Sequence, residues 1–152
     1  MRIRQGDVAG DEATRLLDAY FAYRAAAFPG PGAYRLSRPD ATDYAPGRGV
    51  FLLVEDDDRV PVGCAGVRLL TPRRAEVKHV WLDPAARSRG WADTLMDEVE
   101  RRAVALGAAE LVLDTHRTLE PAARLYARHG FAPIEPYNDN PNATAWLRKA
   151  LG

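Results

Sequence analysis

The sequence has a single cysteine, no long apolar run and no excess of charge of either sign. Cys64 alone can form neither an intramolecular disulfide nor a thiolate metal cluster, and we expect it to be a small buried apolar residue. No segment approaches the roughly 18 apolar residues of a membrane span, and the N-terminus lacks the apolar stretch of a signal peptide, so we expect a cytoplasmic protein. Lys plus Arg and Asp plus Glu number 21 each, which argues against nucleic acid or an anionic membrane as a partner.

The three histidines do not form a metal-binding pattern. His79, His116 and His129 are scattered and lack the H-E-x-x-H spacing, so the sequence predicts no metal site. We expect His79 to be structural and to face away from Glu76, because side chains alternate along a strand. His116 follows a predicted strand; we expect it in a surface loop, and a position that lines the cleft is the alternative.

The chain has the length of one compact domain with one core, and it contains no repeat, linker or low-complexity tract. Apolar periodicity predicts strands at residues 1–5, 50–55, 60–70, 75–82, 111–115, 131–134 and 143–147. It predicts helices at about residues 11–28, 90–106 and 121–130, with a loop rich in proline and glycine over 29–49 that contains at most a short helical turn. Strands and helices in this order indicate a mixed α/β fold with helices on the faces of a sheet.

The segment that follows the strand at 75–82 has the features of an anion site. A helix begins near Gly90, and a helix start exposes unpaired amide groups and the positive end of the helix dipole. Gly90 allows a ligand to approach the backbone, Ala92 is small, and Arg87 and Arg89 add positive charge, which together suit a phosphate or pyrophosphate. An ordinary strand–loop–helix connection with solvated arginines is the alternative. The Walker A and dinucleotide-binding motifs do not match here.

This segment resembles the acyl-CoA signature of the GNAT N-acetyltransferase superfamily, which is Arg or Gln, two residues, Gly, one residue, then Gly or Ala. The matching residues are Arg87, Gly90 and Ala92. A second block resembles the pattern A-x-x-L-Y-x-x-x-G-F of the same family, through Ala122, Leu125, Tyr126, Gly130 and Phe131. The resemblance covers about residues 50–149. It implies one acetyltransferase domain over 1–152, with a mixed, mostly antiparallel sheet of about six or seven strands flanked by about four helices.

The resemblance also implies the reaction, which is transfer of an acetyl group from acetyl-CoA directly to a primary amine, without a metal. Main-chain groups at the strand end would pair with the pantetheine arm, and the amide of Leu82 would stabilise the developing oxyanion. The turn and the helix start would bind the pyrophosphate. The cofactor-binding residues implied in this way are Val80, Trp81, Leu82, Arg87, Ser88, Arg89, Gly90, Trp91 and Ala92.

Glu76 is the first of two catalytic residues that the resemblance implies. In family members related to histone acetyltransferases, a glutamate at this spacing acts as general base, directly or through water. Regular alternation would place Glu76 on the same strand face as Lys78, Val80 and Leu82. The alternative is a glutamate that is solvated or paired with Lys78 or Arg74 and takes no part in the chemistry.

Tyr126 is the second implied catalytic residue. In the family, a tyrosine at this position lies close to the sulfur of CoA and serves as general acid for the departing thiolate. The alternative is a core tyrosine at helical spacing. The sequence departs from the family at Leu119, where an asparagine often contacts the cofactor, so one cofactor hydrogen bond is in doubt.

The first helix and the loop after it contain candidate substrate-binding residues, which are Tyr23, Arg24, Phe28 and Tyr34. Aromatic rings beside a guanidinium would suit a small amine that carries an apolar part and a carboxylate. A helix that packs its aromatic face on the sheet is the alternative. The balanced net charge favours a small-molecule acceptor, with a protein acetyltransferase and an acyl-CoA sensor without turnover as alternatives. Homodimers are common in the superfamily, so a homodimer is compatible with the resemblance.

Overall fold

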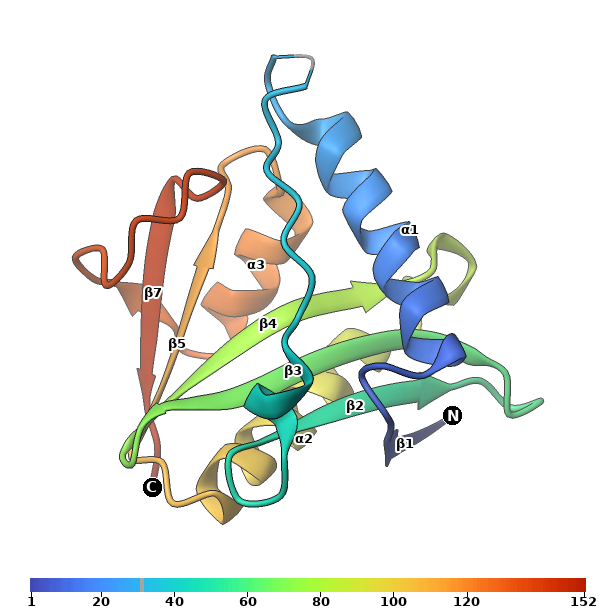
Figure 1. Cartoon of the computed structure of the whole chain (residues 1–152), viewed down its shortest axis with the longest axis horizontal. Helices are drawn as coiled ribbons and strands as arrows, with labels where there is room; N and C mark the ends of the chain where they lie inside the picture. The colour runs from blue at the N-terminus through green and yellow to red at the C-terminus, as the bar shows by residue number, and fades with distance from the viewer. Residues whose placement is uncertain (31) are drawn as a thin grey trace.

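A seven-stranded sheet forms the centre of the computed structural model, which describes residues 1–30 and 32–152 (Figure 1). The strands are β1 (Arg2–Gln5), β2 (Gly49–Glu55), β3 (Pro61–Thr71), β4 (Arg74–Leu82), β5 (Glu110–Thr115), β6 (Ala132–Pro133) and β7 (Ala145–Ala150). Their order in the sheet is β1-β2-β3-β4-β5-β7-β6, and every neighbouring pair is antiparallel except β4 and β5. The predicted mixed, mostly antiparallel sheet is confirmed.

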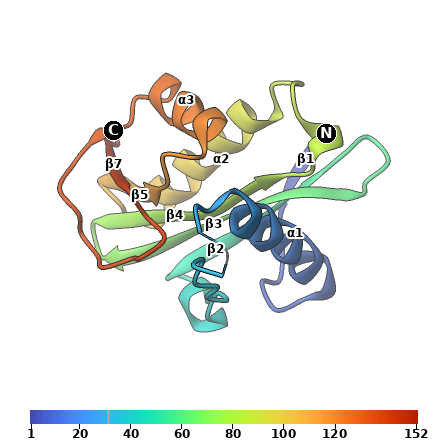
Figure 2. The same cartoon turned by 90° about the horizontal axis from the view of Figure 1, so that it is seen from above.

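Helices cover both faces of the sheet. They are α1 (Asp11–Ala27), α2 (Trp91–Ala105) and α3 (Glu120–Arg128), and Figure 2 shows α1 on one face and α2 with α3 on the other. About four helices were expected, whereas the described residues form three together with two short 3-10 turns, Ala41–Tyr44 and Pro84–Ala86. Among the described residues of the proline- and glycine-rich segment 29–49, only one such turn forms, because these residues interrupt helices. Pro31 in this segment lies outside the described residues.

The core consists of one apolar cluster on each face of the sheet. On the face of α2, Leu95, Met96 and Val99 recur at helical spacing and are buried against the strands. On the opposite face, Leu16 and Phe21 of α1 pack in the same way. Complete burial of one such side chain contributes roughly 1.5–3 kcal/mol. None of the helices in the described part of the chain is long and apolar enough to cross a membrane.

β4 contains a bulge at His79. The register with β3 shifts between Cys64 and Gly66, and His79 has a left-handed backbone with φ of 57°. A bulge adds one residue to one strand and reverses the alternation of side chains beyond it. The side chain of Cys64 donates to the carbonyl of His79 at 3.3 Å, on the buried side of this irregularity.

The bulge overturns the predicted faces of β4. His79 packs on Tyr20 of α1, with ring centroids 5.5 Å apart, whereas Val80 and Leu82 belong to the core under α2. Before the bulge, Ala75 and Val77 lie on the α2 face, so Glu76 lies on the α1 face. The predictions that Glu76 shares a face with Val80 and Leu82, and that His79 faces away from Glu76, were therefore wrong. In a regular strand, successive side chains point to opposite faces of the sheet. The extra residue of the bulge interrupts this alternation, so the residues after it lie on the face opposite to the one predicted.

β4 and β5 diverge toward their carboxyl ends (Figure 1). The two strands pair only from Arg74 with Glu110 to Glu76 with Val112. β5 continues along β7 to Thr115, while β4 continues along β3. The edge of β4 from residue 77 to residue 82 is consequently unpaired on the β5 side, and this divergence creates the opening in which the site lies.

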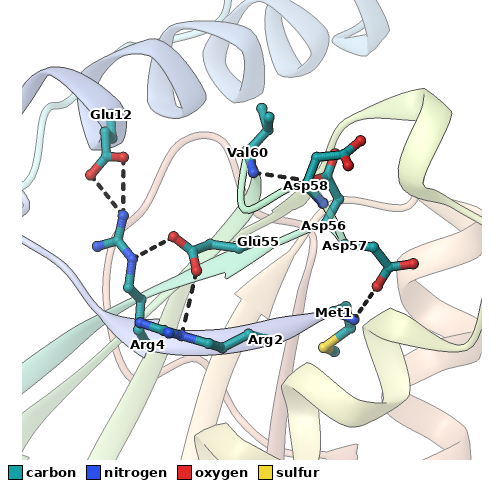
Figure 3. A network of polar contacts seen from close by, with 9 residues as sticks. All are labelled: Met1, Arg2, Arg4, Glu12, Glu55, Asp56, Asp57, Asp58 and Val60. Atoms are coloured by element: carbon teal, nitrogen blue, oxygen red, sulfur yellow. Dashed lines mark hydrogen bonds and ion pairs between the residues drawn. The ribbon is translucent and has the colours of Figure 1, made fainter.

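A network of ion pairs fixes the edge strand β1 (Figure 3). Arg4 donates to Glu55 of β2 at 2.7 Å and to Glu12 of α1 at 2.8 Å, and Arg2 lies 3.5 Å from Glu55. The hydrogen bond from Arg4 holds the pKa of Glu55 below its usual value. The network therefore ties β1 to both β2 and α1.

This network predicts a pH-dependent contribution to stability. The pKa of Glu55 is lower in the folded than in the unfolded protein, so the contribution is present above the unfolded pKa, near 4.3, and is lost as the pH falls through the folded pKa. We expect Glu55→Gln to unfold at a lower temperature than the wild type at pH 7, and the difference to shrink as the pH falls below the unfolded pKa and through the folded pKa. Thermal unfolding across this range tests it, and a constant difference would contradict it.

Candidate functional site

A cavity of about 990 Å³ opens where β4 and β5 diverge. On the α2 side it is lined by residues of the strand end, the turn and the helix start, which include Val80, Trp81, Leu82, Arg87, Ser88, Gly90, Trp91 and Ala92. On the α1 side it is lined by polar and aromatic residues that include Tyr20, Tyr23, Arg24, Tyr34, Lys78, His79, Asp114 and Asn142. Tyr126 of α3 lies in the same wall. Among the predicted site residues, Arg89, Phe28 and Glu76 are not part of the lining.

The start of α2 is open to an anion. Gly90 is the N-cap, with φ of 77°, and because it has no side chain, the first amides of the helix receive no cap from it. The guanidinium of Arg87 donates to the carbonyl of Leu82 at 3.0 Å and lies 4.9 Å from the ring of Trp81. Unpaired amides, the helix dipole and a positioned cation together can hold a phosphate group. Arg89 turns instead over the ring of Trp91 at 5.1 Å.

The free edge of β4 offers main-chain hydrogen bonds to the cavity. The amide of Asp83 donates to Val62 at 2.7 Å, across to β3. Successive amides of a strand point in opposite directions, so the amide of Leu82 points away from β3, toward the diverging edge. An extended ligand with amide groups can therefore pair along this edge as an additional strand.

Tyr126 places a hydroxyl group in the wall of the cavity. Its side chain is 7% exposed, and its ring packs edge-on against Phe131 with centroids 5.9 Å apart. Within the described residues, the hydroxyl has no hydrogen-bond partner. Burial raises the pKa of Tyr126 above its ordinary value, so the hydroxyl stays protonated at neutral pH and can donate to a ligand.

Glu76 is held by neighbouring side chains and is only 1% exposed. Its Oε1 accepts from Nε of Arg68 at 3.0 Å and lies 2.9 Å from Nη2 of the same guanidinium. Its Oε2 accepts from the hydroxyl of Tyr137 at 2.7 Å. The carboxylate thus joins β3, β4 and the loop between β6 and β7, behind the cavity wall.

Arg24 presents a guanidinium on the α1 side of the cavity. It donates to the hydroxyl of Tyr20 at 2.9 Å and to the carbonyl of Asn142 at 3.2 Å, and it lies 5.4 Å from the ring of Tyr34. It forms no ion pair with any residue that the structure describes. The side chain is therefore held in place while its charge remains uncompensated. Phe28 packs beside it against Tyr34, outside the cavity.

Three residues of the site or its surroundings were missed or misplaced by sequence reasoning. Asp114 and Asn142 line the cavity, although neither was predicted as a site residue; Asp114 could have been found as the polar residue at the carboxyl end of a buried strand. His116 was expected in a surface loop, and that prediction was wrong. The residue is buried, and the centroid of its ring lies 4.9 Å from that of Phe28. Cys64 is buried as predicted, and burial raises the pKa of its thiol.

Comparison with known proteins gives one family and one fold. The model of the acetyltransferase (GNAT) family matches residues 14–131. An uncharacterized N-acetyltransferase of Schizosaccharomyces pombe is 35% identical over 99 residues, which are 64% of this chain and 61% of that protein. The chain therefore spans about three fifths of the length of this curated relative.

Two solved structures show the same fold. A GNAT-family acetyltransferase from Staphylococcus aureus is 17% identical, with a TM-score of 0.82 and 99% of each chain covered. A phosphinothricin acetyltransferase from Sinorhizobium meliloti, in complex with acetyl-CoA, is 18% identical, with a TM-score of 0.67, over 99% of this chain and 88% of that one. The likeness of fold extends over almost the whole chain.

Proposed function

Because the chain belongs to the acetyltransferase (GNAT) family, we propose that residues 1–152 act as one domain that transfers an acetyl group from acetyl-CoA to the primary amine of a small molecule. One observation carries this proposal: a single cavity connects an uncapped helix start, the free edge of β4 and the hydroxyl of Tyr126. The Sinorhizobium meliloti acetyltransferase of the same fold binds acetyl-CoA, which supports the choice of donor.

Each part of the cavity has a role toward the donor in this proposal. Acetyl-CoA supplies an activated thioester and a pyrophosphate. The amides at the start of α2 and the guanidinium of Arg87 bind the pyrophosphate. The edge of β4 pairs with the pantetheine arm, the amide of Leu82 stabilises negative charge on the carbonyl oxygen, and Tyr126 protonates the departing sulfur.

Arg24 indicates the class of acceptor. A held guanidinium without an acidic partner is suited to a carboxylate, and Tyr20 and Tyr34 provide apolar surface beside it. We therefore propose an amine that also carries a carboxylate, as amino acids do. The phosphinothricin acetyltransferase of the same fold is named for an amino acid of this kind.

The test begins with acetyl-CoA binding by calorimetry, followed by thiol release with L-phenylalanine, phosphinothricin, 2-phenylethylamine and a lysine-containing peptide. Binding together with release supports the proposal. Binding with release only for a lysine-containing peptide would indicate a protein acceptor, and binding without release for any amine would indicate a sensor. A folded wild type that does not bind acetyl-CoA would overturn the proposal.

Arg24→Gln is expected to weaken binding of acceptors with a carboxylate. A hydrogen bond to a charged group contributes roughly 1.5–3 kcal/mol, so KM for an amino acid should rise about 10- to 100-fold. KM for its decarboxylated analogue should change little; L-phenylalanine and 2-phenylethylamine form such a pair. Arg101→Gln is the control, because the side chain of Arg101 is 70% exposed on α2, outside the cavity. An equal effect on both amines would contradict the assignment.

A further inference from the structure

We propose that Asp114 is a further catalytic residue, which binds the ammonium group of the acceptor and takes up its proton. This inference rests on the proposed function and adds the group that the transfer still lacks, a proton acceptor inside the cavity. Asp114 lies near the carboxyl end of β5, on the strand that diverges from β4, and its side chain lines the cavity.

Hydrogen bonds orient Asp114 from behind. Its Oδ2 accepts from Nδ2 of Asn138 at 2.8 Å, and Oδ1 of Asn138 in turn accepts from the indole N–H of Trp146 at 2.9 Å. Asn138 is thereby fixed with its amide nitrogen toward the carboxylate. A proton acceptor held by a second group, which is itself held by a third, is the arrangement that general bases require.

Asp114 also differs from the other aspartates of the cavity wall in its partners. Asp43 is paired with Arg68 at 2.8 Å, and Asp93 is bound by His129 at 2.8 Å. Asp40 caps the turn that begins at residue 41. Asp114, by contrast, has no ion-pair partner among the residues that the structure describes. Its negative charge is therefore available to a cation in the cavity, and a protonated amine is such a cation.

The charge of Asp114 acts at the place where the reaction occurs. Burial raises the pKa of Tyr126 most, Tyr20 and then the negative charge of Asp114 raise it further, and Arg24 lowers it. Burial also raises the pKa of Tyr20 most, Arg24 lowers it, and the charge of Asp114 raises it. The carboxylate of Asp114 thus influences the pKa of Tyr126, the proposed acid, and of Tyr20, whose hydroxyl accepts a hydrogen bond from Arg24.

The two other candidates on this face of the sheet fit the role less well. Both carboxylate oxygens of Glu76 are engaged, by Arg68 and Tyr137, and the residue does not line the cavity. Burial lowers the pKa of His79 to about 3, so this ring is neutral and does not attract an ammonium group. We infer that Glu76 is a positioning residue, which holds Arg68 and the loop after β6.

These positions determine where each proton goes during the acetyl transfer. The amine enters as an ammonium ion, and its first proton passes to Asp114 and then to solvent. The amine nitrogen then forms the amide bond as the carbon–sulfur bond of the thioester breaks. Tyr126 gives its proton to the sulfur, and the second proton of the nitrogen replaces it. The products are the N-acetylated amine, free CoA and one released proton.

Asp114→Asn tests the inference, since it preserves the shape of the side chain and an oxygen that can accept from Asn138. We expect the rate with an accepted amine to fall about 100-fold or more at pH 7. The variant can use only amine that is already neutral, so its rate should rise about tenfold per pH unit below the pKa of the amine, while the wild-type rate stays level. Asp139→Asn is the matched control, because Asp139 is exposed in the same loop as Asn138.

A second readout does not depend on turnover. With CoA in place of acetyl-CoA, calorimetry should show at least tenfold weaker binding of 2-phenylethylamine to Asp114→Asn than to the wild type. Unchanged rate and unchanged amine binding in this variant would overturn the inference while leaving the proposed function intact. A wild-type pH profile in Asp114→Asn, with its loss in Glu76→Gln, would assign the base to Glu76. A wild type that acetylates no amine would overturn both proposals.

Discussion

Tyr126→Phe is expected to lower kcat by about 100-fold or more while the Kd for acetyl-CoA stays within about twofold. The substitution removes only the hydroxyl, which has no protein partner in the described part of the chain and faces the cavity. Without it the sulfur departs as a thiolate that no side chain protonates. Because burial raises the pKa of Tyr126, the wild-type hydroxyl carries its proton throughout the neutral range, so the defect should persist from pH 6 to pH 9.

Tyr137→Phe provides the control for this variant. This substitution also removes a half-buried hydroxyl, but the hydroxyl of Tyr137 donates to Glu76 behind the cavity wall. We expect kcat of Tyr137→Phe to remain within about threefold of the wild type and thermal stability to fall slightly, since a typical hydrogen bond contributes about 1 kcal/mol. A small effect in Tyr126→Phe, or equal effects in both variants, would remove Tyr126 from the mechanism.

The parts of the site that follow from short contiguous patterns could be predicted from the sequence. The turn before α2 was found because Arg87, Gly90 and Ala92 are close in the chain, and the structure places all three in the lining of one cavity. Tyr126, which a second block of the same kind indicated, lies in the wall of the same cavity, and its role as the acid stays a prediction. The sheet and its mixed pairing followed from the order of strands and helices, which needs no knowledge of individual side chains.

The rest could not be predicted, because it depends on a local departure from regular geometry. His79 adopts a left-handed backbone, which is uncommon outside glycine, and the neighbouring residues in the sequence do not predict it. This one residue decides which side chains of β4 face α1. The divergence of β4 from β5 begins earlier, after Glu76, and it brings Asp114 into the cavity. A residue at the end of β5 therefore acquires its surroundings from the course of another strand.

The positions of Glu76 and Asp114 illustrate the same point. Both carboxylates lie on the α1 face, and register pairs Glu76 with Val112, two residues before Asp114. Where the strands still pair, Glu76 is enclosed by Arg68 and Tyr137. Beyond the pairing, where the strands separate, Asp114 meets the cavity. The divergence of the two strands thus gives two similar side chains different surroundings.

Gly90→Glu is expected to raise the Kd for acetyl-CoA by at least about 100-fold. The new carboxylate would lie at the uncapped start of α2, where it competes with the pyrophosphate for the same amides and repels it. The fold itself has room for a side chain, because a Cβ at residue 90 would meet no atom within 4 Å. The backbone there is left-handed, with φ of 77°, so some strain, on the order of 1–2 kcal/mol, accompanies any side chain.

Gly47→Glu separates this strain from the loss of the anion site. Gly47 has φ of 81°, its Cβ would also meet no atom within 4 Å, and it is exposed in the turn before β2, outside the cavity. The two variants should therefore lose similar thermal stability, and only Gly90→Glu should lose acetyl-CoA binding in calorimetry. Equal binding by both would mean that the start of α2 does not hold the pyrophosphate. Loss in both would trace the effect to the fold and not to the anion site, because both substitutions put a glutamate at an exposed glycine with a left-handed backbone.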